Sequence, residues 1–145
     1  MWPKLVINLA KLQHNTEVIA KMVEQVGGRV FAVTKVVGGD PYCARAMLAG
    51  GAAGLADSRL ENIRRLRQAG IDAPVLLLRS PALSEVSDVI KIADLSLVSD
   101  QAVLHALNQA AALAGMTHSV ILMVDLGEGR EGVAPQDLPR LVEFA

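Results

Sequence analysis

The sequence predicts an α/β fold built from about five successive strand–helix units, and three observations carry this prediction. Short apolar runs alternate with longer segments of helical periodicity along the whole chain. Hydrophobic residues make up 52% of the chain but aromatic residues only 3%, which is typical of the aliphatic interior of layered α/β proteins. The apolar runs recur roughly every 20 to 25 residues, the length of one compact βα unit, with centres near Ala32, Gly54, Leu76, Leu97 and Leu122.

The first predicted elements are a short strand at residues 4–8 and an amphipathic helix that follows it. Asn8 is a suitable N-cap for this helix, and the pair Gly27-Gly28 is a suitable stop. The inner stripe of the helix is expected at the apolar positions that recur with helical spacing, namely Leu9, Leu12, Ile19, Val23 and Val26.

The next strand is predicted at residues 30–34, an apolar run that ends at Lys35. A turn over residues 36–40 contains two glycines and leads into a helix over residues 41–50. Pro41 suits the first position of that helix, because the missing N–H of proline is not needed there.

A strand at residues 53–56 and a helix over residues 58–69 form the following unit. The run Ser58-Arg59-Leu60-Glu61 has the pattern of a capping box, so Ser58 is expected to cap the helix. Its inward side chains are expected to be Leu60, Ile63 and Leu66. The remaining elements are predicted as strands at 74–78, 94–98 and 119–124 and as helices over 83–92, 100–114 and 136–145.

Both a closed βα barrel and a doubly wound open sheet satisfy this alternation, and spacing alone does not separate them. The regular repeat favours the barrel. A complete (β/α)₈ barrel takes about 250 residues, so a chain of 145 residues supplies only about the first five of its units. We therefore expect a partial TIM barrel, preceded by a short strand and a helix, whose open edge and apolar face favour a homo-oligomer.

Charge and cysteine content narrow the class of partner. A formal net charge of -1 offers no basic excess for nucleic acid or an anionic membrane. Cys43 is the only cysteine, which excludes an intrachain disulfide and removes the usual thiols of a zinc site, so no metal is expected. No apolar run approaches the roughly 20 residues that span a bilayer. We expect a cytoplasmic protein whose partners are small molecules or proteins.

Lys35 is the first candidate for chemistry, because working residues of barrel enzymes lie at the carboxyl ends of the strands. It is either an amine that forms a Schiff base with a carbonyl compound or a lysine that extends into solvent. Arg130 is the only basic residue in a loop at 125–132 with three acids and three glycines. Its guanidinium either faces an anionic oxygen or pairs with Glu128 or Glu131 in solvent.

Tyr42, the only tyrosine, either hydrogen-bonds a ligand phosphate from the turn after Lys35 or packs at the start of its helix. The three histidines have no metal-ligand spacing and are expected on the surface or at helix ends. Further polar residues that follow predicted strands are Asp57, Ser58, Arg79, Ser80 and Ser99.

Six motifs, in order along the chain, resemble the alanine-racemase-like family of pyridoxal-phosphate barrels and, most closely, its ornithine-racemase-type branch of amino-acid racemases. The motifs are INLAKLQHN, AVTKVVGGDP, LADSRLENIRRLR, LLRSP, SLVSD and MVDLGEGREGV. The pieces AVTK and DLGEGREG are the ones most specific to that branch.

This resemblance implies that Lys35 carries pyridoxal 5'-phosphate as a Schiff base and that Arg130 lies near the phenolic oxygen of the cofactor. The substrate would be an amino acid, and the branch suggests ornithine or another basic one. Tyr42 does not match the tyrosine that alanine racemases contribute from their C-terminal β-domain.

Residues 1–145 would form the N-terminal portion of the barrel domain, truncated and without the β-domain, so an incomplete or inactive racemase is expected. The alternatives are a non-catalytic pyridoxal-phosphate homeostasis protein, an inactive truncated relative, and a lyase such as a D-threonine aldolase, which would need a metal site.

Overall fold

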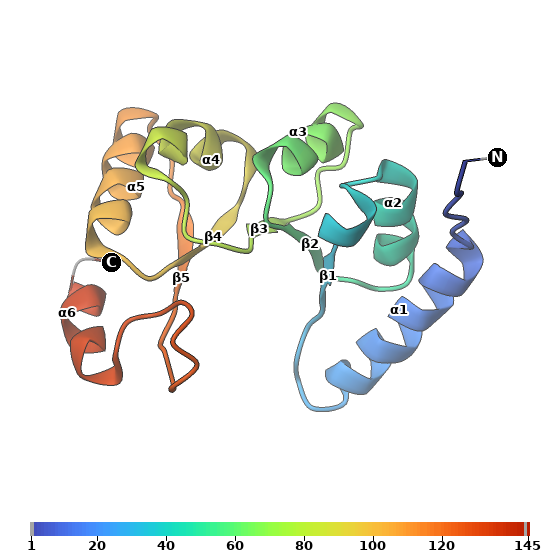
Figure 1. The fold of residues 1–145 in the computed structure, drawn as a ribbon, viewed down its shortest axis with the longest axis horizontal. Coiled ribbons are helices and arrows are strands. Elements are labelled where there is room, and N and C mark those ends of the chain that lie inside the picture. The colour runs from blue at the N-terminus through green and yellow to red at the C-terminus, as the bar shows by residue number, and fades with distance from the viewer. Residues whose placement is uncertain (1, 144) are drawn as a thin grey trace.

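The structure is a computed structural model that describes residues 2–143 and 145. Within these residues, five parallel strands form one sheet in the order β1-β2-β3-β4-β5 (Figure 1). This sequential order confirms the predicted α/β fold with five βα units, because a doubly wound sheet would reverse its strand order. The strands are β1 (Phe31–Val33), β2 (Gly54–Asp57), β3 (Val75–Leu77), β4 (Leu95–Val98) and β5 (Ser119–Leu122).

Helices α2 to α5 lie along one side of the sheet, with α1 and α6 at its two ends (Figure 1). Three short 3₁₀ turns, η1 (Lys35–Val37), η2 (Leu83–Glu85) and η3 (Pro135–Asp137), precede α2, α4 and α6. The predicted last helix includes residue 144, which lies outside the described residues. The helices are α1 (Leu9–Glu24), α2 (Pro41–Ala49), α3 (Leu60–Gln68), α4 (Val86–Ile92), α5 (Gln101–Leu113) and α6 (Leu138–Glu143).

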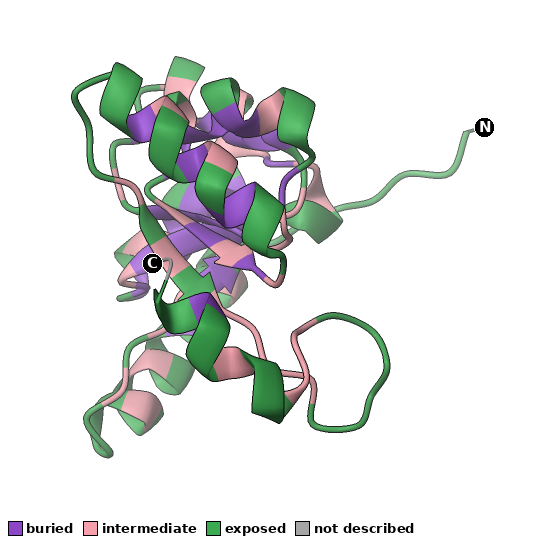
Figure 2. Cartoon of the chain, turned by 90° about the vertical axis from the view of Figure 1, so that its left-hand side faces the viewer, coloured by how far each residue is buried: buried purple, intermediate pink, exposed green. Residues whose placement is uncertain are grey.

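The core lies between the sheet and helices α2 to α5. Leu55 of β2 pairs in register with Val75 of β3, and both side chains are fully buried in one cluster with Ile63 and Leu66 of α3. Figure 2 shows that buried residues concentrate on the strands and on the helix faces turned toward them. Burying this aliphatic layer is the main source of folding free energy in such a domain.

The predicted strand at residues 4–8 is wrong. These residues form no strand, and Leu5 and Val6 are 82% and 86% exposed. A strand needs a neighbour for its backbone hydrogen bonds, and the described residues offer none at this position. The predicted N-cap is confirmed, since the Asn8 side chain accepts a hydrogen bond from the Lys11 backbone N–H at 3.0 Å.

The predicted inner stripe of α1 is also mostly wrong, because Ile19 and Val26 are 52% and 84% exposed. Instead α1 buries Thr16, which faces α2 across Gly50. A Cβ built on Gly50 would lie 2.8 Å from the Thr16 Cβ, so the two backbones approach closely only because residue 50 is glycine. This close approach, together with Leu12 of the predicted stripe, which packs against the core, fixes how α1 packs.

The inward stripe of α3 is confirmed, because Leu60, Ile63 and Leu66 are all buried. The predicted cap of this helix is wrong: α3 begins one residue later than a Ser58 cap requires, and its N-cap residue, Arg59, makes no side-chain cap bond. Asp57 takes over part of that role, since its Oδ1 accepts a hydrogen bond from the Arg59 backbone N–H at 2.9 Å.

Candidate functional site

The polar residues that the sequence analysis singled out follow the carboxyl ends of the strands. Because all five strands are parallel, these ends lie along the same edge of the sheet. Lys35 follows β1 and Arg130 follows β5, which are the two outer strands (Figure 1). The structure therefore places both residues at the predicted edge but separates them by three strands.

Lys35 is exposed and begins the 3₁₀ turn η1. The Thr34 carbonyl closes this turn, accepting hydrogen bonds from the backbone N–H groups of Val37 and Gly39, both at 3.1 Å. Gly38 and Gly39 have φ angles of +62° and +64°, which side chains other than glycine rarely adopt. The chain thus reverses within a few residues and presents Lys35 from a tightly bonded turn.

The turn leads directly into α2 through Asp40. The Asp40 side chain caps α2 by accepting a hydrogen bond from the Cys43 backbone N–H at 2.9 Å, and this bond lowers the pKa of the Asp40 carboxyl. Cys43 is buried, as expected of a packing residue. Tyr42, in the first turn of α2, is 69% exposed, so it does not pack at the helix start as the second interpretation of this residue required.

A buried polar cluster lies behind the Lys35 turn and consists of Thr34, Asp57 and Asn62. The Thr34 hydroxyl donates to Asp57 Oδ2 at 2.7 Å, and Asn62 Nδ2 donates to both carboxylate oxygens of Asp57 at 3.0 and 3.2 Å. Thr34 and Asp57 are fully buried and Asn62 is 8% exposed. The cluster joins the ends of β1 and β2 to the first turn of α3.

Helix α3 also touches the Lys35 turn directly. The Arg65 guanidinium donates a hydrogen bond to the Gly38 carbonyl at 2.8 Å, and Gly39 lies against Asn62. One helix therefore holds both glycines of the turn, from a position that the chain reaches only after β2.

Arg79 and Ser80, after β3, differ in the hydrogen bonds that their side chains form. The Arg79 guanidinium bonds both carboxylate oxygens of Glu85 at 2.8 Å and the Ser58 carbonyl at 2.8 Å. Its hydrogen bonds hold the pKa of Glu85 below the usual value, with a smaller contribution from the Ala82 backbone N–H. By contrast, Ser80 Oγ is buried and forms no hydrogen bond with any residue that the structure describes. Arg79 therefore links the residues after β2 to those after β3, whereas the Ser80 hydroxyl is enclosed without a partner among the described residues.

The loop after β5 is organised around Asp125. Its carboxylate accepts hydrogen bonds from the backbone N–H groups of Gly127, Glu128 and Gly129 at 2.8 to 3.2 Å. These bonds, the one from Gly127 foremost, lower the pKa of Asp125. Arg130 follows this turn, and its side chain is exposed. Within residues 2–143 and 145 it forms no ion pair, so the predicted alternative of pairing with Glu128 or Glu131 is not observed.

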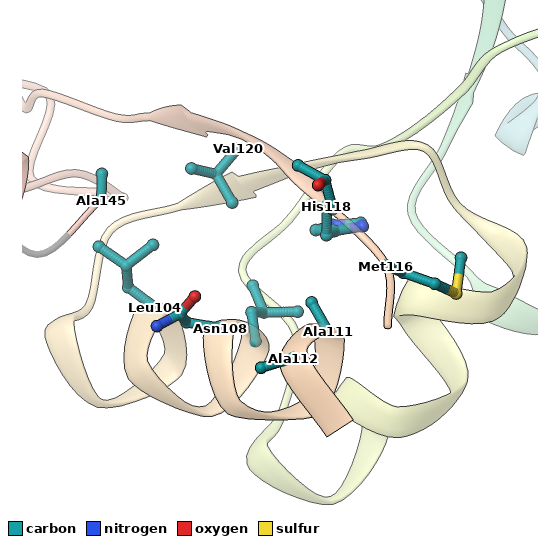
Figure 3. Close-up of a pocket in the computed structure, with 10 residues that line it drawn as sticks. Leu104, Asn108, Ala111, Ala112, Met116, His118, Val120 and Ala145 are labelled. Carbon is teal, nitrogen blue, oxygen red and sulfur yellow. The ribbon is translucent and has the colours of Figure 1, made fainter. Parts of the chain in front are cut away.

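A pocket lies between α5 and β5 (Figure 3). Since β1 and β5 are the two outer strands, this pocket is at the other edge of the sheet from Lys35, which follows β1. His118, which lines it, precedes β5 and therefore lies at the amino end of that strand. Its Nε2 is 2.8 Å from Ser96 Oγ, and burial lowers the pKa of the imidazole, with Asp94 acting in the opposite direction. His14 and His105 are exposed as predicted, whereas His118, in the segment between the end of α5 and the start of β5, is half-buried. This pocket is remote from Lys35.

The described residues contain neither a membrane-spanning helix nor a metal-binding group of side chains. None of their helices is long and apolar enough to cross a membrane. In the same part of the chain, no group of three or more His, Cys, Asp or Glu side chains could hold a metal ion.

Sequence reasoning missed Thr34 and Asn62. Thr34 is the one polar residue in the apolar run before Lys35, and Asn62 is a polar residue beside the inward Ile63 of α3. Polar residues at positions that periodicity assigns to the interior are the signal that could have identified both, since a buried polar group needs a partner.

The known proteins that this chain resembles are mostly amino-acid racemases. The family model described as alanine racemase, N-terminal domain, matches residues 7–145. The chain is 38% identical over 132 residues to an ornithine racemase of Acetoanaerobium sticklandii and 35% identical over 133 residues to a lysine racemase of Thermotoga maritima. It aligns over 91% and 92% of its own length but spans only 37% and 38% of those proteins.

Among solved structures, an alanine racemase from E. faecalis matches with a TM-score of 0.84 at 29% identity, over 95% of this chain and 38% of that one. A D-threonine aldolase from Filomicrobium marinum matches with a TM-score of 0.82 at 24% identity, which shows a shared fold only. The solved relatives therefore agree with the partial-barrel architecture.

Proposed function

Because the chain belongs to the alanine racemase N-terminal domain family, we propose that it supplies the first part of a pyridoxal-phosphate-dependent amino-acid racemase in which Lys35 carries the cofactor. The observation that carries this proposal is the position of Lys35: an exposed primary amine at the carboxyl end of β1, in a turn held by backbone hydrogen bonds. Such an amine is able to form a Schiff base with an aldehyde.

The residues along this edge of the sheet fit the chemical groups of pyridoxal phosphate. Lys35 Nζ, which is exposed at the start of the turn, would bond the aldehyde carbon. Arg130, which has no ion pair among the described residues, would face the phenolic oxygen. Tyr42, exposed next to the turn, stays a prediction as a weak phosphate contact.

When bound, pyridoxal phosphate draws the electrons of the substrate Cα–H bond into its ring. The residues of this chain would hold and orient the cofactor and would move a proton. Lys35 Nζ would hold the cofactor between turnovers, and its free amine would then accept or return the Cα proton on one face. Racemisation needs a second acid/base on the opposite face, and we assign no residue of this chain to that role.

The relatives suggest a substrate and the part of the enzyme that this chain supplies, and both are proposals. Since the two curated relatives described above are lysine and ornithine racemases, we propose a basic amino acid as substrate. The chain spans about 37% to 38% of those proteins, so most of their length has no counterpart here. Residues 1–145 are therefore proposed as the N-terminal portion of a barrel domain that is a poor or inactive racemase by itself.

A second candidate is a protein that binds pyridoxal phosphate without catalysis. The observation that favours it is the exposed Lys35 amine in its hydrogen-bonded turn, since holding the cofactor would need this amine but no second acid/base. The two candidates differ in one measurable property: only a racemase interconverts the enantiomers of a free amino acid.

The test is the loss of optical rotation from L-ornithine, L-lysine and L-alanine in the presence of pyridoxal phosphate. The chain is assayed alone and with the C-terminal part of the Acetoanaerobium ornithine racemase that its alignment does not cover. We expect racemisation of a basic amino acid only in the mixture, its loss in Lys35→Ala, and its retention in Lys91→Ala, which changes an exposed lysine of α4. If the mixture takes up the cofactor at Lys35 but racemises nothing, the non-catalytic candidate replaces the racemase.

A further inference from the structure

We propose that Asp57 is a positioning residue for Lys35: through Thr34 and Asn62, its buried carboxylate fixes the backbone from which the Lys35 side chain extends. This inference rests on the proposed role of Lys35 and deepens it. Neither the charge of Asp57 nor its distance in sequence from Lys35 suggests such a role, which follows from the contacts between three elements.

The first step is the burial of the carboxylate. Asp57 has no exposed surface, and a buried carboxylate is costly unless hydrogen bonds replace its hydration. Its oxygens receive hydrogen bonds from the Thr34 hydroxyl, the Asn62 amide and the Arg59 backbone N–H. These donors are all neutral, so the geometry of the hydrogen bonds, and not an ion pair, keeps the cluster in place.

The second step connects the cluster to the turn through Thr34. Its side chain bonds Asp57 at 2.7 Å, while its carbonyl accepts the backbone N–H groups of Val37 and Gly39, both at 3.1 Å. Its backbone N–H donates to the Ala56 carbonyl at 2.9 Å. Every polar group of Thr34 is therefore used, and rotating its peptide would break bonds on both sides of Lys35.

The third step connects the cluster to the turn through Asn62. While its amide nitrogen bonds Asp57, its Cα and Cβ lie against Gly39, where an added Cβ would be 2.9 and 2.7 Å away from them. Asn62 thus keeps Gly39 in place sterically at the same time as it satisfies Asp57. Displacing Asn62 would both loosen the turn and remove its amide's hydrogen bonds to the Asp57 carboxylate.

The placement of Asp57 makes it a positioning residue. Its side chain is bonded on the helix side of the sheet, to Asn62 of α3, whereas Lys35 is exposed at the strand end. A lysine side chain has several rotatable bonds, so the range of positions that its amine can reach is limited only if the backbone is fixed. A shift of about 1 Å in the Lys35 backbone is enough to lower the rate of a reaction at the Lys35 amine.

The test compares Thr34→Val, which removes the hydroxyl with little change in shape, with Thr34→Ser, which retains it. Thr16→Val is the matched control, because Thr16 is also a buried threonine whose hydroxyl bonds a carbonyl, in α1. Two quantities are measured: hydrogen exchange of the amides of residues 37–40, and the rate at which pyridoxal phosphate with borohydride labels Lys35 relative to Lys91.

We expect Thr34→Val to raise the exchange of these amides about tenfold or more and to lower the Lys35-to-Lys91 labelling ratio, while Thr34→Ser and Thr16→Val match the wild type in both. Asp57→Asn, which keeps the size of the side chain but removes one acceptor, should act in the same direction and serves if Thr34→Val fails to fold. Unchanged exchange in both variants, or a serine variant that behaves like the valine one, would overturn the inference.

The exchange measurement needs no cofactor, so it separates this inference from the proposed function. If Lys35 takes no pyridoxal phosphate in any variant, the proposed function fails, whereas faster exchange in Thr34→Val still shows that the cluster holds the turn. If wild-type Lys35 is labelled and Thr34→Val changes neither quantity, the positioning role fails alone.

Discussion

Gly39 and Asn62 lie so close together that the turn after Lys35 has no room for a side chain at position 39. A Cβ built there would be 2.7 Å from the Asn62 Cβ and 2.9 Å from its Cα and backbone oxygen. Because two of these three atoms belong to the backbone of α3, the neighbour cannot move away cheaply. The conformation of the Lys35 turn and the position of α3 therefore depend on each other.

Gly39→Ala should for this reason destabilise the protein by about 2–4 kcal/mol, adding overpacking to the strain of a positive φ. Gly129→Ala is the matched control, since Gly129 has a similar φ of +62° but nothing within 4 Å. We expect the control to lose only about 1 kcal/mol. Urea unfolding measures both, and equal losses in the two variants would contradict the contact between Gly39 and Asn62.

Leu66→Ala should cost about 2–5 kcal/mol, because it leaves a cavity beneath α3 in the cluster that includes Leu55 and Val75. Leu113→Ala removes the same atoms from a side chain that is 90% exposed at the end of α5, and should change the free energy of unfolding by less than about 0.5 kcal/mol. Chemical denaturation distinguishes the two. A small effect of Leu66→Ala would show that the sheet and α3 are not packed as described.

His118 should make stability fall as the pH is lowered through about 6.5. Burial lowers the pKa of this imidazole, so the folded protein binds fewer protons there than the unfolded chain. Stability from this group is then complete above the unfolded pKa and decreases as the pH falls toward the folded one. Thermal unfolding at pH 7.5 and 5.5 should show a smaller difference in Tm for His118→Gln than for wild type.

The control for this pH effect is His105→Gln, because His105 is exposed on α5. It should keep the wild-type difference in Tm between the two pH values. The same difference in all three proteins would mean that His118 is not buried against Ser96 in solution.

Exposed apolar residues on the outer strands predict self-association at micromolar concentration. Val33 of β1 and Ile121 of β5 are 38% and 43% exposed, and outer strands also carry unpaired backbone groups. Light scattering should report a dimer or larger species, and Ile121→Lys should shift it toward the monomer while Leu113→Lys does not. A strictly monomeric wild type at this concentration would count against the prediction.

The order and type of the core elements could be predicted from the sequence because they depend on local patterns. The stripe of Leu60, Ile63 and Leu66 has helical spacing, and these side chains are buried as expected. The wrong predictions concern which segments pack against each other. Residues 4–8 have strand-like composition but no strand beside them among the described residues. Helix α1 buries Thr16 against Gly50, while Leu9 and Ile19 of its predicted stripe are exposed.

The candidate site, too, could be predicted from the sequence only in part. Lys35 could be located at a strand end from its neighbours in the sequence alone. The cluster of Thr34, Asp57 and Asn62 could not, because residues 23 positions apart meet only through the register that pairs Val33 with Ala56. Periodicity gives the length of strands but not their register, so contacts across strands emerge only from the structure.

The central claim is that Lys35 is the residue that forms a Schiff base with pyridoxal phosphate. The most direct measurement incubates the purified chain with limiting pyridoxal phosphate, reduces it with borohydride and locates the modified lysine by mass spectrometry. We predict one dominant adduct at Lys35 that is lost in Lys35→Ala and kept in Lys91→Ala. No adduct at Lys35, or label spread over the exposed Lys4, Lys11, Lys21 and Lys91, would contradict the claim.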